Sequence, residues 1–248
     1  MTTSDSLAGR VVLITGAAKR LGAALARGFH AHGASVAIHY HRSAADAERL
    51  RDEFNTSRRN SAIAANANLL DVAQLPALVE RTLDAFGRLD VLINNASTFY
   101  PTPVGRIGVE EWDDLMGTNL KAPLFLSQAA APALRKAQGL IINMIDIHGQ
   151  RPLASHPVYS CAKAGLVMLT KSLARELGPE VRVNGIAPGP ILWPEGGLDP
   201  ELQDEIIAKT QLKRRGSPED IVRTALFFAT DAPYVTGQIL SVDGGRSV

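Results

Sequence analysis

The sequence predicts an α/β protein: a single Rossmann-type domain over residues 1–248, in which helices cover both faces of a doubly wound parallel sheet of about seven strands. Short apolar runs rich in Val, Ile and Leu recur along the chain, and they have the composition of strands buried on both faces. These runs alternate with amphipathic helical patterns, without an internal repeat or a linker-like break. A glycine-containing turn joins the first run to the first helix.

The elements of the first half follow from periodicity and from their end signals. Glycine follows the last helical residue at Gly33 and Gly87, and Asp71 can cap the third helix. The expected strands are 11–14, 35–40, 62–69 (the weakest pattern) and 91–93, and the expected helices run from the glycine turn to about 32, from 44 to about 54 and from 71 to about 86.

The second half continues the alternation around two polar loops, expected at 94–108 and 146–157. Pro123 is positioned to bend a long helical region over 109–134. The Pro- and Gly-rich stretch 187–199 is expected to be mobile, and Asp199 and Ser217 each begin a helix, since Pro and an acid follow them. The other expected elements are strands at 140–144, 181–186 and 239–242 and a helix that ends near 177.

Composition narrows the functional classes. A net charge of +1 does not favour nucleic acid or an anionic membrane as a partner, and one cysteine excludes an internal disulfide. Residues 1–5 include an acid and no apolar segment, so we expect no signal peptide, and no apolar run is long enough to span a bilayer. The six histidines lack metal-ligand spacing. We expect a cytoplasmic protein with no bound metal.

The segment Tyr159-Ser160-Cys161-Ala162-Lys163 places a phenol and an amine on one helix face, because residues four apart are neighbours there. An ammonium at about 4–6 Å favours the phenolate, so Lys163 is expected to lower the pKa of Tyr159. The phenol could then exchange a proton near neutral pH. The plain alternative is an amphipathic helix in which the Tyr packs and the Lys reaches solvent.

The first strand, turn and helix form the expected place for a dinucleotide pyrophosphate. Gly16 and Gly22 allow the backbone to approach phosphates, and the start of the helix favours their charge. Arg20 stands where the usual pattern has its middle glycine, so an ordinary glycine turn remains an alternative.

The end of the second strand bears on the choice between NAD and NADP. The segment His39-Tyr40-His41-Arg42-Ser43 has no acid to hold a ribose 2′-hydroxyl. Arg42 and Ser43 can bind a 2′-phosphate, and Lys19 can assist from the first turn. The segment favours NADP, and the alternative is a solvated basic turn.

Polar residues follow two later strands at the edge where such sheets bind ligands. Asn94-Asn95-Ala96 follows the fourth strand, and Asn119 lies in the next helix. Asp146 follows the fifth strand at the same edge, so it can face Tyr159. The alternatives are a buried Asn that bonds backbone and an Asp that caps a turn.

These motifs resemble those of the short-chain dehydrogenase/reductase family over almost the whole chain. They are Thr15-Gly16 to Gly22, Asn94-Asn95-Ala96, Asn119, Tyr159 with Lys163, and Pro188-Gly189. Within the family the chain is most similar to the pteridine reductases, on the segments TGAAKRLG (15–22), HYHRSAA (39–45), NNASTFYPTP (94–103) and NMID (143–146). Asp146 stands where most of the family has Ser, and Arg20 in the turn is characteristic of the same branch.

The resemblance implies a role for each matching residue. The catalytic set would be Asp146, Tyr159, Lys163 and Asn119. The NADPH set would be Gly16, Lys19, Arg20, Leu21, Gly22, His41, Arg42, Ser43, Asn68, Leu69, Asn95, Ala96, Ser97, Tyr159, Lys163, Pro188 and Gly189. The substrate set would be Arg20, Ser97, Phe99, Asp146, Tyr159, Pro190 and Trp193, with Phe99 stacked on a pterin. Asn68 departs from the Asp that the family usually carries near the adenine, although an amide can still bond there.

The function implied is that of an NADPH-dependent pteridine reductase, which transfers hydride to a dihydropterin, with dihydrofolate and oxidised pterins as further candidate substrates. A carbonyl reductase of 3-oxoacyl or other ketone substrates is the alternative enzyme. A non-catalytic NADPH-binding sensor or partner protein is the alternative of another class. The resemblance also implies a homotetramer built on the helices near Asn119 and Tyr159.

Overall fold

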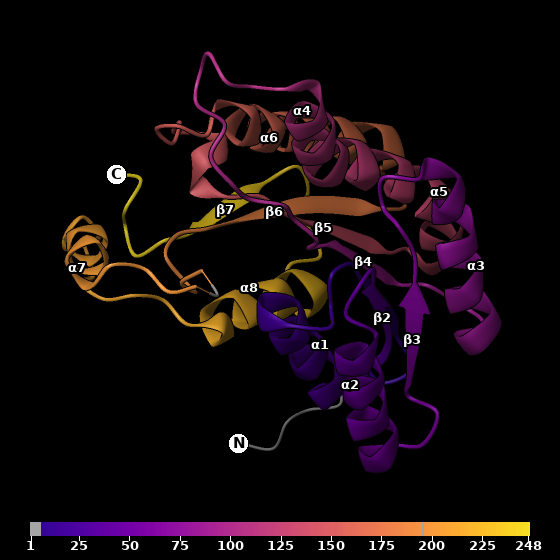
Figure 1. The fold of residues 1–248 in the computed structure, drawn as a ribbon. Coiled ribbons are helices and arrows are strands. Elements are labelled where there is room, and N and C mark those ends of the chain that lie inside the picture. Colours follow the sequence, from indigo (N-terminus) through magenta and orange to yellow (C-terminus); the bar gives the residue numbers. More distant parts are fainter. Residues whose placement is uncertain (1–5, 195) are drawn as a thin grey trace.

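A computed structural model describes residues 6–194 and 196–248, and within them seven strands form one parallel sheet in the order β3-β2-β1-β4-β5-β6-β7 (Figure 1). The strands are β1 Val11–Ile14, β2 Ser35–Tyr40, β3 Ala62–Asn66, β4 Val91–Asn94, β5 Leu140–Met144, β6 Arg182–Pro188 and β7 Ile239–Val242. The order reverses between β1 and β4, so ligands are expected outside the carboxyl ends of these strands. The predicted fold class is confirmed, whereas the prediction about residues 1–5 lies outside the described residues.

Two layers of helices enclose the sheet (Figure 1). One layer contains α1 Arg20–Ala31, α2 Ala44–Ser57 and α8 Pro218–Thr230, and the other contains α3 Leu75–Phe86, α4 Val109–Met116, α5 Ala122–Ala137 and α6 Pro157–Leu177. Helix α7 Pro200–Ala208 lies outside both layers. In the described part of the chain, no helix has the length and apolarity that crossing a membrane requires.

Strand β1 shows why the central strands are apolar at every position. Val12 and Ile14 pack in the cluster that includes α1 and α8, whereas Val11 and Leu13 pack in the cluster that includes α3 and α5. Successive side chains point to opposite faces of a strand, so a sheet covered on both faces needs an apolar residue at each position.

Some expected boundaries move. Strand β3 ends at Asn66 and does not reach residue 69, because Asn68 begins a turn in which its Oδ1 accepts a hydrogen bond from the Leu70 amide at 3.1 Å. Asp71 caps a short 3₁₀ turn, η1 Val72–Gln74, that precedes α3. As predicted, a glycine with positive φ follows each of the helices α1 and α3: Gly87 caps α3, and Gly33 comes directly after His32, the cap of α1.

The helical region 109–134 is divided near Pro123. A π-helical turn, η2 Gly117–Lys121, separates α4 from α5, and the Ala122 amide donates to the carbonyl of Gly117, five residues back. Pro123 has no N–H to donate to the carbonyl of Asn119, so the regular ladder cannot continue there. The region is therefore not one helix bent at Pro123, as predicted, but two helices separated by a π turn that contains Asn119.

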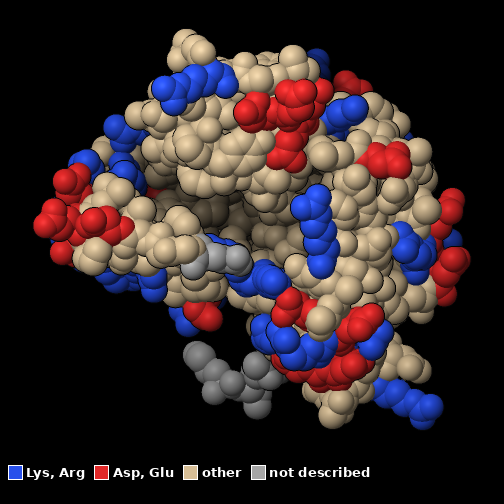
Figure 2. All heavy atoms as spheres, viewed as in Figure 1, with Lys and Arg blue, Asp and Glu red and all other residues tan. Residues whose placement is uncertain are grey.

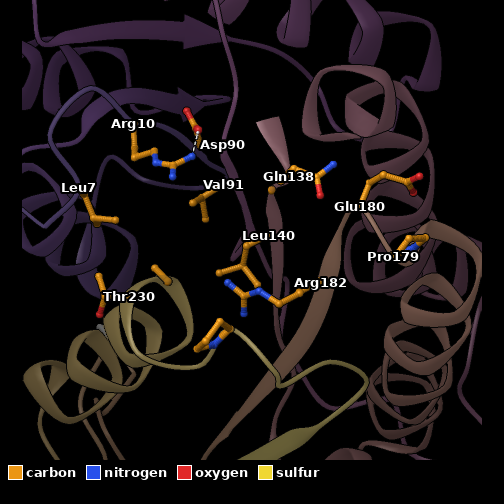
Figure 3. A pocket seen from close by; sticks show the side chains of 13 residues that line it. Leu7, Arg10, Asp90, Val91, Gln138, Leu140, Pro179, Glu180, Arg182 and Thr230 are labelled. Carbon is orange, nitrogen blue, oxygen red and sulfur yellow. Dashed lines mark hydrogen bonds and ion pairs between the residues drawn. The ribbon is translucent and has the colours of Figure 1, made fainter. Parts of the chain in front are cut away.

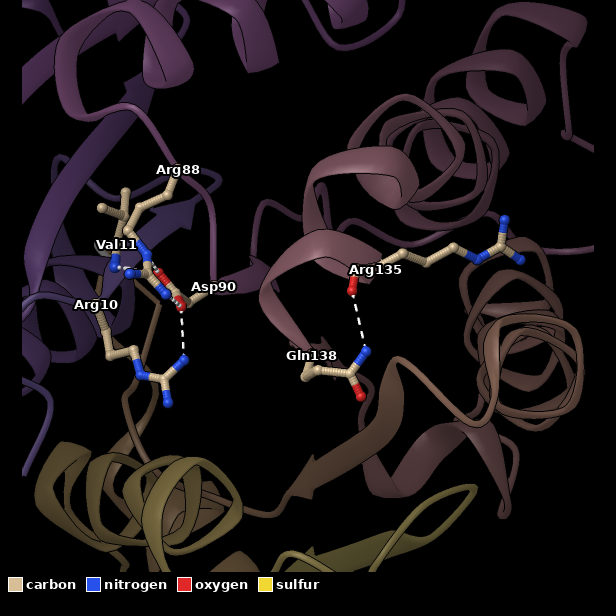
Figure 4. Close-up of polar contacts among 6 residues, drawn as sticks. All are labelled: Arg10, Val11, Arg88, Asp90, Arg135 and Gln138. Carbon is tan, nitrogen blue, oxygen red and sulfur yellow. Dashed lines mark hydrogen bonds and ion pairs between the residues drawn. The ribbon is translucent and has the colours of Figure 1, made fainter.

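The amino ends of the central strands are joined by Asp90. Its carboxylate accepts hydrogen bonds from Arg10 at 2.8 Å, Arg88 at 2.6 Å and the Val11 amide at 2.9 Å (Figure 4). A cavity of about 330 Å³ lies beside it, with Arg10 and Arg182 among its lining side chains (Figure 3). This cavity is at the sheet edge opposite to the one where parallel α/β folds bind their ligands.

Candidate active site

Two glycines shape the turn between β1 and α1. Gly16 has a φ of 61°, in the left-handed region, and a β-carbon on Gly22 would collide with the carbonyl oxygen of Gly16. The same β-carbon would lie 2.7 Å from the side-chain nitrogen of Asn95. Gly22 therefore allows α1 to begin directly against the turn and the loop after β4. The first amides of α1 have no intrahelical partner, so this end of the helix can bind an anion.

A groove of about 520 Å³ opens beside the turn. Viewed as in Figure 1, the molecule is hollowed between its two helix layers, and Lys and Arg side chains lie beside the hollow (Figure 2). The predicted cofactor residues that line the groove are Gly16, Lys19, His41, Arg42, Ser43, Asn68, Leu69, Ala96 and Ser97. The close glycines, the start of α1 and the basic rim fit the phosphates of a dinucleotide.

Other predicted cofactor residues support the turn or the loops around it. Asn95 donates from Nδ2 to the carbonyl of Thr15 at 2.8 Å, which ties the loop after β4 to the glycine turn. Gly189, which follows Pro188 at the end of β6, packs against Asp243. Arg20, Leu21 and Gly22 form the start of α1, and the last two members, Tyr159 and Lys163, lie on α6.

Lys19, which is predicted to help bind a phosphate of the cofactor, already forms an ion pair within the protein. Its Nζ lies 3.1 Å from Asp46 Oδ2 on α2, and Arg49 pairs with the same carboxylate at 2.6 Å. The two cations lower the pKa of Asp46, which stays ionised and attached to them. Arg42 and His41, by contrast, are exposed on the groove.

Tyr159 and Asp146 meet at the carboxyl edge of β5. The Tyr159 hydroxyl, in the first helical turn of α6, donates to Asp146 Oδ2 at 2.8 Å. The other carboxylate oxygen, Oδ1, accepts from the His148 amide at 2.8 Å in the short turn η3 Ile147–Gly149. The prediction that Asp146 faces Tyr159 is confirmed, and the cap of a turn, which was the alternative, is a second role of the same side chain.

Lys163 and Asn119 complete the predicted catalytic set. Lys163 is 2% exposed, and its Nζ donates to the carbonyl of Met144 at 2.9 Å and lies 5.6 Å from the centre of the Tyr159 ring. Asn119, in the π turn, accepts from the Ser97 hydroxyl at 2.6 Å and donates to the carbonyl of Leu115 at 2.9 Å. The four predicted catalytic residues thus come from the loop after β5, from α6 and from the break between α4 and α5.

The prediction that Lys163 lowers the pKa of Tyr159 is wrong. Burial of the phenol, followed by the charge of Asp146 and the hydrogen bond to it, raises the pKa of Tyr159 well above its ordinary value. Burial also lowers the pKa of Lys163 to about 8, against a smaller raising effect of Asp146. Tyr159 therefore keeps its proton at neutral pH, which suits a proton donor better than a base.

Phe99, the predicted stacking residue, is 51% exposed beside Tyr159. Its ring stacks on His156 with centroids 4.7 Å apart and an interplanar angle of 10°, and it meets Tyr159 edge-on at 4.8 Å. His156 thus covers one face of Phe99, and about half of the residue stays exposed. Sequence reasoning missed His156, which immediately precedes α6, because its contact with Phe99 joins two loops that are distant in sequence.

Comparisons with known proteins assign the chain to a family. A family model described as enoyl-(acyl carrier protein) reductase matches residues 16–247. Pteridine reductase 1 of Leishmania tarentolae is 38% identical, over 100% of this chain and 99% of its own length. The chain belongs to the short-chain dehydrogenase/reductase family.

Two other relatives of this short-chain reductase carry a different name. The 3-oxoacyl-(acyl-carrier-protein) reductase of Staphylococcus aureus strain Mu50 is 36% identical, over 94% of this chain and 96% of its own length. The corresponding protein of Synechocystis is 35% identical, over 97% and 98% respectively. Members of the family are oxidoreductases that use NAD(P)H, and the chain is an enzyme of this class.

The loop after β6 completes the site of this short-chain reductase. Arg20 donates from Nη2 to the carbonyl of Trp193 at 2.8 Å, and the Arg215 guanidinium lies 5.7 Å from the centre of the Trp193 ring. Pro190 accepts from the Gly216 amide at 3.1 Å. The contact of Arg20 attaches the loop that carries the predicted substrate residues Pro190 and Trp193 to the start of α1, and the contacts of Arg215 and Gly216 attach it to the segment before α8.

Several groove residues were not predicted from the sequence. Thr98, Asp114 and Thr118 line the groove from the loop after β4 and from the α4–η2 region. Thr98 immediately follows the NNAS segment, which is the one sequence signal that could have identified it. Among residues 6–194 and 196–248, no three His, Cys, Asp or Glu side chains are grouped so as to hold a metal ion.

Proposed function

We propose that this short-chain reductase is an NADPH-dependent pteridine reductase, with a dihydropterin as substrate and dihydrofolate and oxidised pterins as further candidates. The observation that carries the proposal is the hydrogen bond of Tyr159 to Asp146, beside the exposed ring of Phe99. A carboxylate accepts hydrogen bonds from the amino and N–H groups of a flat heterocycle, and an aromatic face stacks on its ring. A simple ketone offers neither kind of group.

The preference for NADPH is supported by the charges around the groove. His41, Arg42 and Ser43 line it where β2 ends, and Asp46, the first acid after β2, is occupied by Lys19 and Arg49. No carboxylate of that segment is therefore free to hold a ribose 2′-hydroxyl, whereas Arg42 can pair with a 2′-phosphate. When bound in this groove, NADPH would supply the hydride.

Residues of the protein would donate the proton to the substrate and orient it. Tyr159 carries a proton at neutral pH and can give it from its hydroxyl to the substrate atom that becomes more basic on reduction. Asp146 fixes the direction of that hydroxyl and leaves lone pairs for the substrate. Lys163, buried beneath the site, supplies a positive charge, and Asn119 positions Ser97. Ser97, Arg20 and the loop of Pro190 and Trp193 would border the substrate.

A 3-oxoacyl or other carbonyl reductase is the second candidate, and the relatives that carry the 3-oxoacyl name support it. Tyr159, Lys163 and Asn119 serve ketone reduction equally well. Asp146 and Phe99 favour the pterin. A non-catalytic sensor, the third candidate, has no need of a buried Tyr and Lys, because an unused buried ammonium destabilises the fold.

The test is NADPH oxidation by the parent enzyme and by Asp146→Ser, with dihydrobiopterin, dihydrofolate and an acetoacetyl thioester as substrates. We expect the parent to turn over dihydrobiopterin fastest. Asp146→Ser should lower pterin turnover by about 10- to 100-fold and spare any ketone activity, because a hydroxyl still bonds Tyr159. A parent that reduces only the thioester, or a variant with equal losses on both, would contradict the pterin proposal.

We further propose that the enzyme is a homotetramer, and its cytoplasmic location stays a prediction. Trp112 on α4, Leu124 on α5 and Met168 on α6 are 45%, 39% and 61% exposed, and these helices adjoin Asn119 and Tyr159. Exposed apolar side chains on neighbouring helices favour an interface between copies. Light scattering on the chromatographed protein gives the oligomeric mass, and a monomer would contradict this proposal.

A further inference from the structure

His39 lies at the carboxyl side of β2 and borders the cofactor groove, yet it is only 2% exposed. Its Nδ1 is 3.0 Å from the Gly16 amide nitrogen, and its Nε2 is 3.1 Å from the carbonyl oxygen of Ala67. A backbone N–H can only donate and a carbonyl can only accept. The imidazole must therefore be neutral, with its hydrogen on Nε2 and its Nδ1 accepting from Gly16.

The backbone of His39 holds the next residue of the same turn. The Ala17 amide donates to the carbonyl of His39 at 2.9 Å, so one residue of β2 bonds two successive amides of the turn. The bond to Ala67 attaches this arrangement to the segment after β3. The turn leads directly into α1, so these bonds fix where the free amides at the start of the helix lie.

We propose that His39 is a positioning residue for the cofactor: its neutral imidazole holds the Gly16 turn in the shape that presents the start of α1 to the cofactor's phosphates. The inference rests on the proposed function only in requiring that NADPH binds in this groove. It assigns no contact between His39 and the cofactor, since both ring nitrogens are already bonded within the protein.

The environment of the ring keeps it in the required form. Burial lowers the pKa of His39 to about 4; the bond to Ala67 opposes this, and the charges of His41 and Arg81 add to it. The ring is thus neutral at physiological pH. An imidazolium would turn an N–H toward the Gly16 amide, so two donors would face each other and the turn would have to move.

Two substitutions separate the two ring bonds. Asparagine places its carbonyl oxygen near the position of Nδ1, so His39→Asn keeps an acceptor for Gly16 and loses the bond to Ala67. Glutamine places its amide nitrogen near Nε2, so His39→Gln keeps the bond to Ala67 and leaves the Gly16 amide without a partner. Both variants carry a side-chain amide at this position, and each loses one buried hydrogen bond of the parent. A general loss of stability should therefore be similar in the two variants and cannot explain a difference in NADPH affinity.

The experiment measures the Kd and KM for NADPH, kcat at saturating NADPH, and Tm for both variants. We expect His39→Asn to bind NADPH within about threefold of the parent and His39→Gln to bind it about tenfold more weakly or worse, with kcat unchanged within about threefold in each. Equal affinities in the two variants, or a loss confined to kcat, would overturn the inference. If the parent itself fails to bind NADPH, the proposed function fails instead.

A second measurement needs no variant. Nitrogen-15 NMR of the imidazoles reports the tautomer of His39 in the unaltered enzyme. We expect a neutral ring protonated on Nε2 at neutral pH, with a hydrogen-bond coupling between Nδ1 and the Gly16 amide. A ring protonated on Nδ1, or charged at neutral pH, would overturn the inference even if both variants fail to fold.

Discussion

Tyr159 bears the proton in the proposed mechanism, and its ring has a packing role that a phenylalanine can retain, since it contacts Phe99 edge-on at 4.8 Å. Tyr159→Phe should therefore fold and bind NADPH normally while turnover falls by about 10²–10⁴-fold, the usual contribution of general acid catalysis. Steady-state kinetics measure the change in turnover, and Tm and an NADPH titration check that folding and cofactor binding are unchanged.

The chain offers a matched control for this variant. Tyr100 also donates to a carboxylate, that of Asp114 at 2.9 Å, and burial with that contact raises its pKa to about 12. Tyr100→Phe should leave turnover within a few-fold of the parent. Comparable losses in the two variants would mean that Tyr159 acts only through the fold.

Lys163 is costly to the fold at the pH where the enzyme is expected to work. Its pKa is lowered from 10.5 to about 8 by burial. Between these values the unfolded chain binds more protons than the folded one, so stability rises with pH in that window, and below pH 8 the full penalty applies, about 3 kcal/mol. Lys163→Met removes the charge, so at neutral pH it should raise the free energy of unfolding by about 1–3 kcal/mol while it abolishes turnover.

The control for this substitution is Lys171→Met, because Lys171 is exposed two turns further along α6. Urea unfolding at pH 7 and at pH 10 measures both variants. The gain in Lys163→Met should shrink at the higher pH, where most of the parent's penalty has been relieved, and Lys171→Met should show little change at either pH. A destabilised Lys163→Met at neutral pH would contradict this account.

At the scale of elements, the connection between β2 and α2 is proposed to select the cofactor. Arg42→Ala should raise the KM for NADPH about tenfold or more and leave that for NADH unchanged, because a charge-assisted phosphate contact contributes about 1.5–3 kcal/mol. Arg51→Ala is the control on the same side of the molecule, since Arg51 lies on α2 paired with Asp52. An unchanged KM for NADPH in Arg42→Ala would make the assignment of the phosphate site untenable.

Elements whose hydrophobic residues recur with a clear helix or strand period could be predicted from the sequence. Features that depend on particular turns, such as the end of β3 and the π turn, could not. The apolar run of β1 and the Tyr and Lys spacing of α6 are local signals, and both elements lie where the sequence indicates. The end of β3 depends on the turn that Asn68 makes with Leu70. The π turn at Asn119 depends on how the chain passes Pro123, which the sequence marks only as an irregular point.

The same distinction applies to the site. Parallel strand order places Asp146 and Tyr159 at one edge, so their meeting could be predicted. The direction of the pKa shift of Tyr159 could not, because it depends on how far the phenol is buried and on the charge of Asp146 beside it. The stacking of Phe99 on His156 joins two loops, and no spacing along the chain indicates it.

At the scale of the molecule, Asp90 holds β1 and β4 together at the edge opposite the active site. Asp90→Ala leaves the Val11 amide without its acceptor and two arginines without their carboxylate. Those arginines are about half exposed, so solvent screens them, and we expect a loss of about 2–3 kcal/mol in the free energy of unfolding.

Denaturant unfolding measures this loss. The control variant is Asp52→Ala, which removes an exposed ion pair, and its free energy of unfolding should lie within about 0.5 kcal/mol of the parent. Equal effects would show that the buried position of Asp90 adds nothing.

The strand order also constrains how the chain is made. β1 is synthesised first among the described strands but lies in the middle of the sheet, and the residues that bond its amino end to β4 are 79 and 80 positions apart in sequence. Until β4 leaves the ribosome, β1 presents an open, apolar strand edge, the kind of edge that pairs with other chains. The open edge of β1 should therefore be exposed to aggregation from the time β1 emerges until β4 has left the ribosome and paired with it, after which the open edge is that of β4.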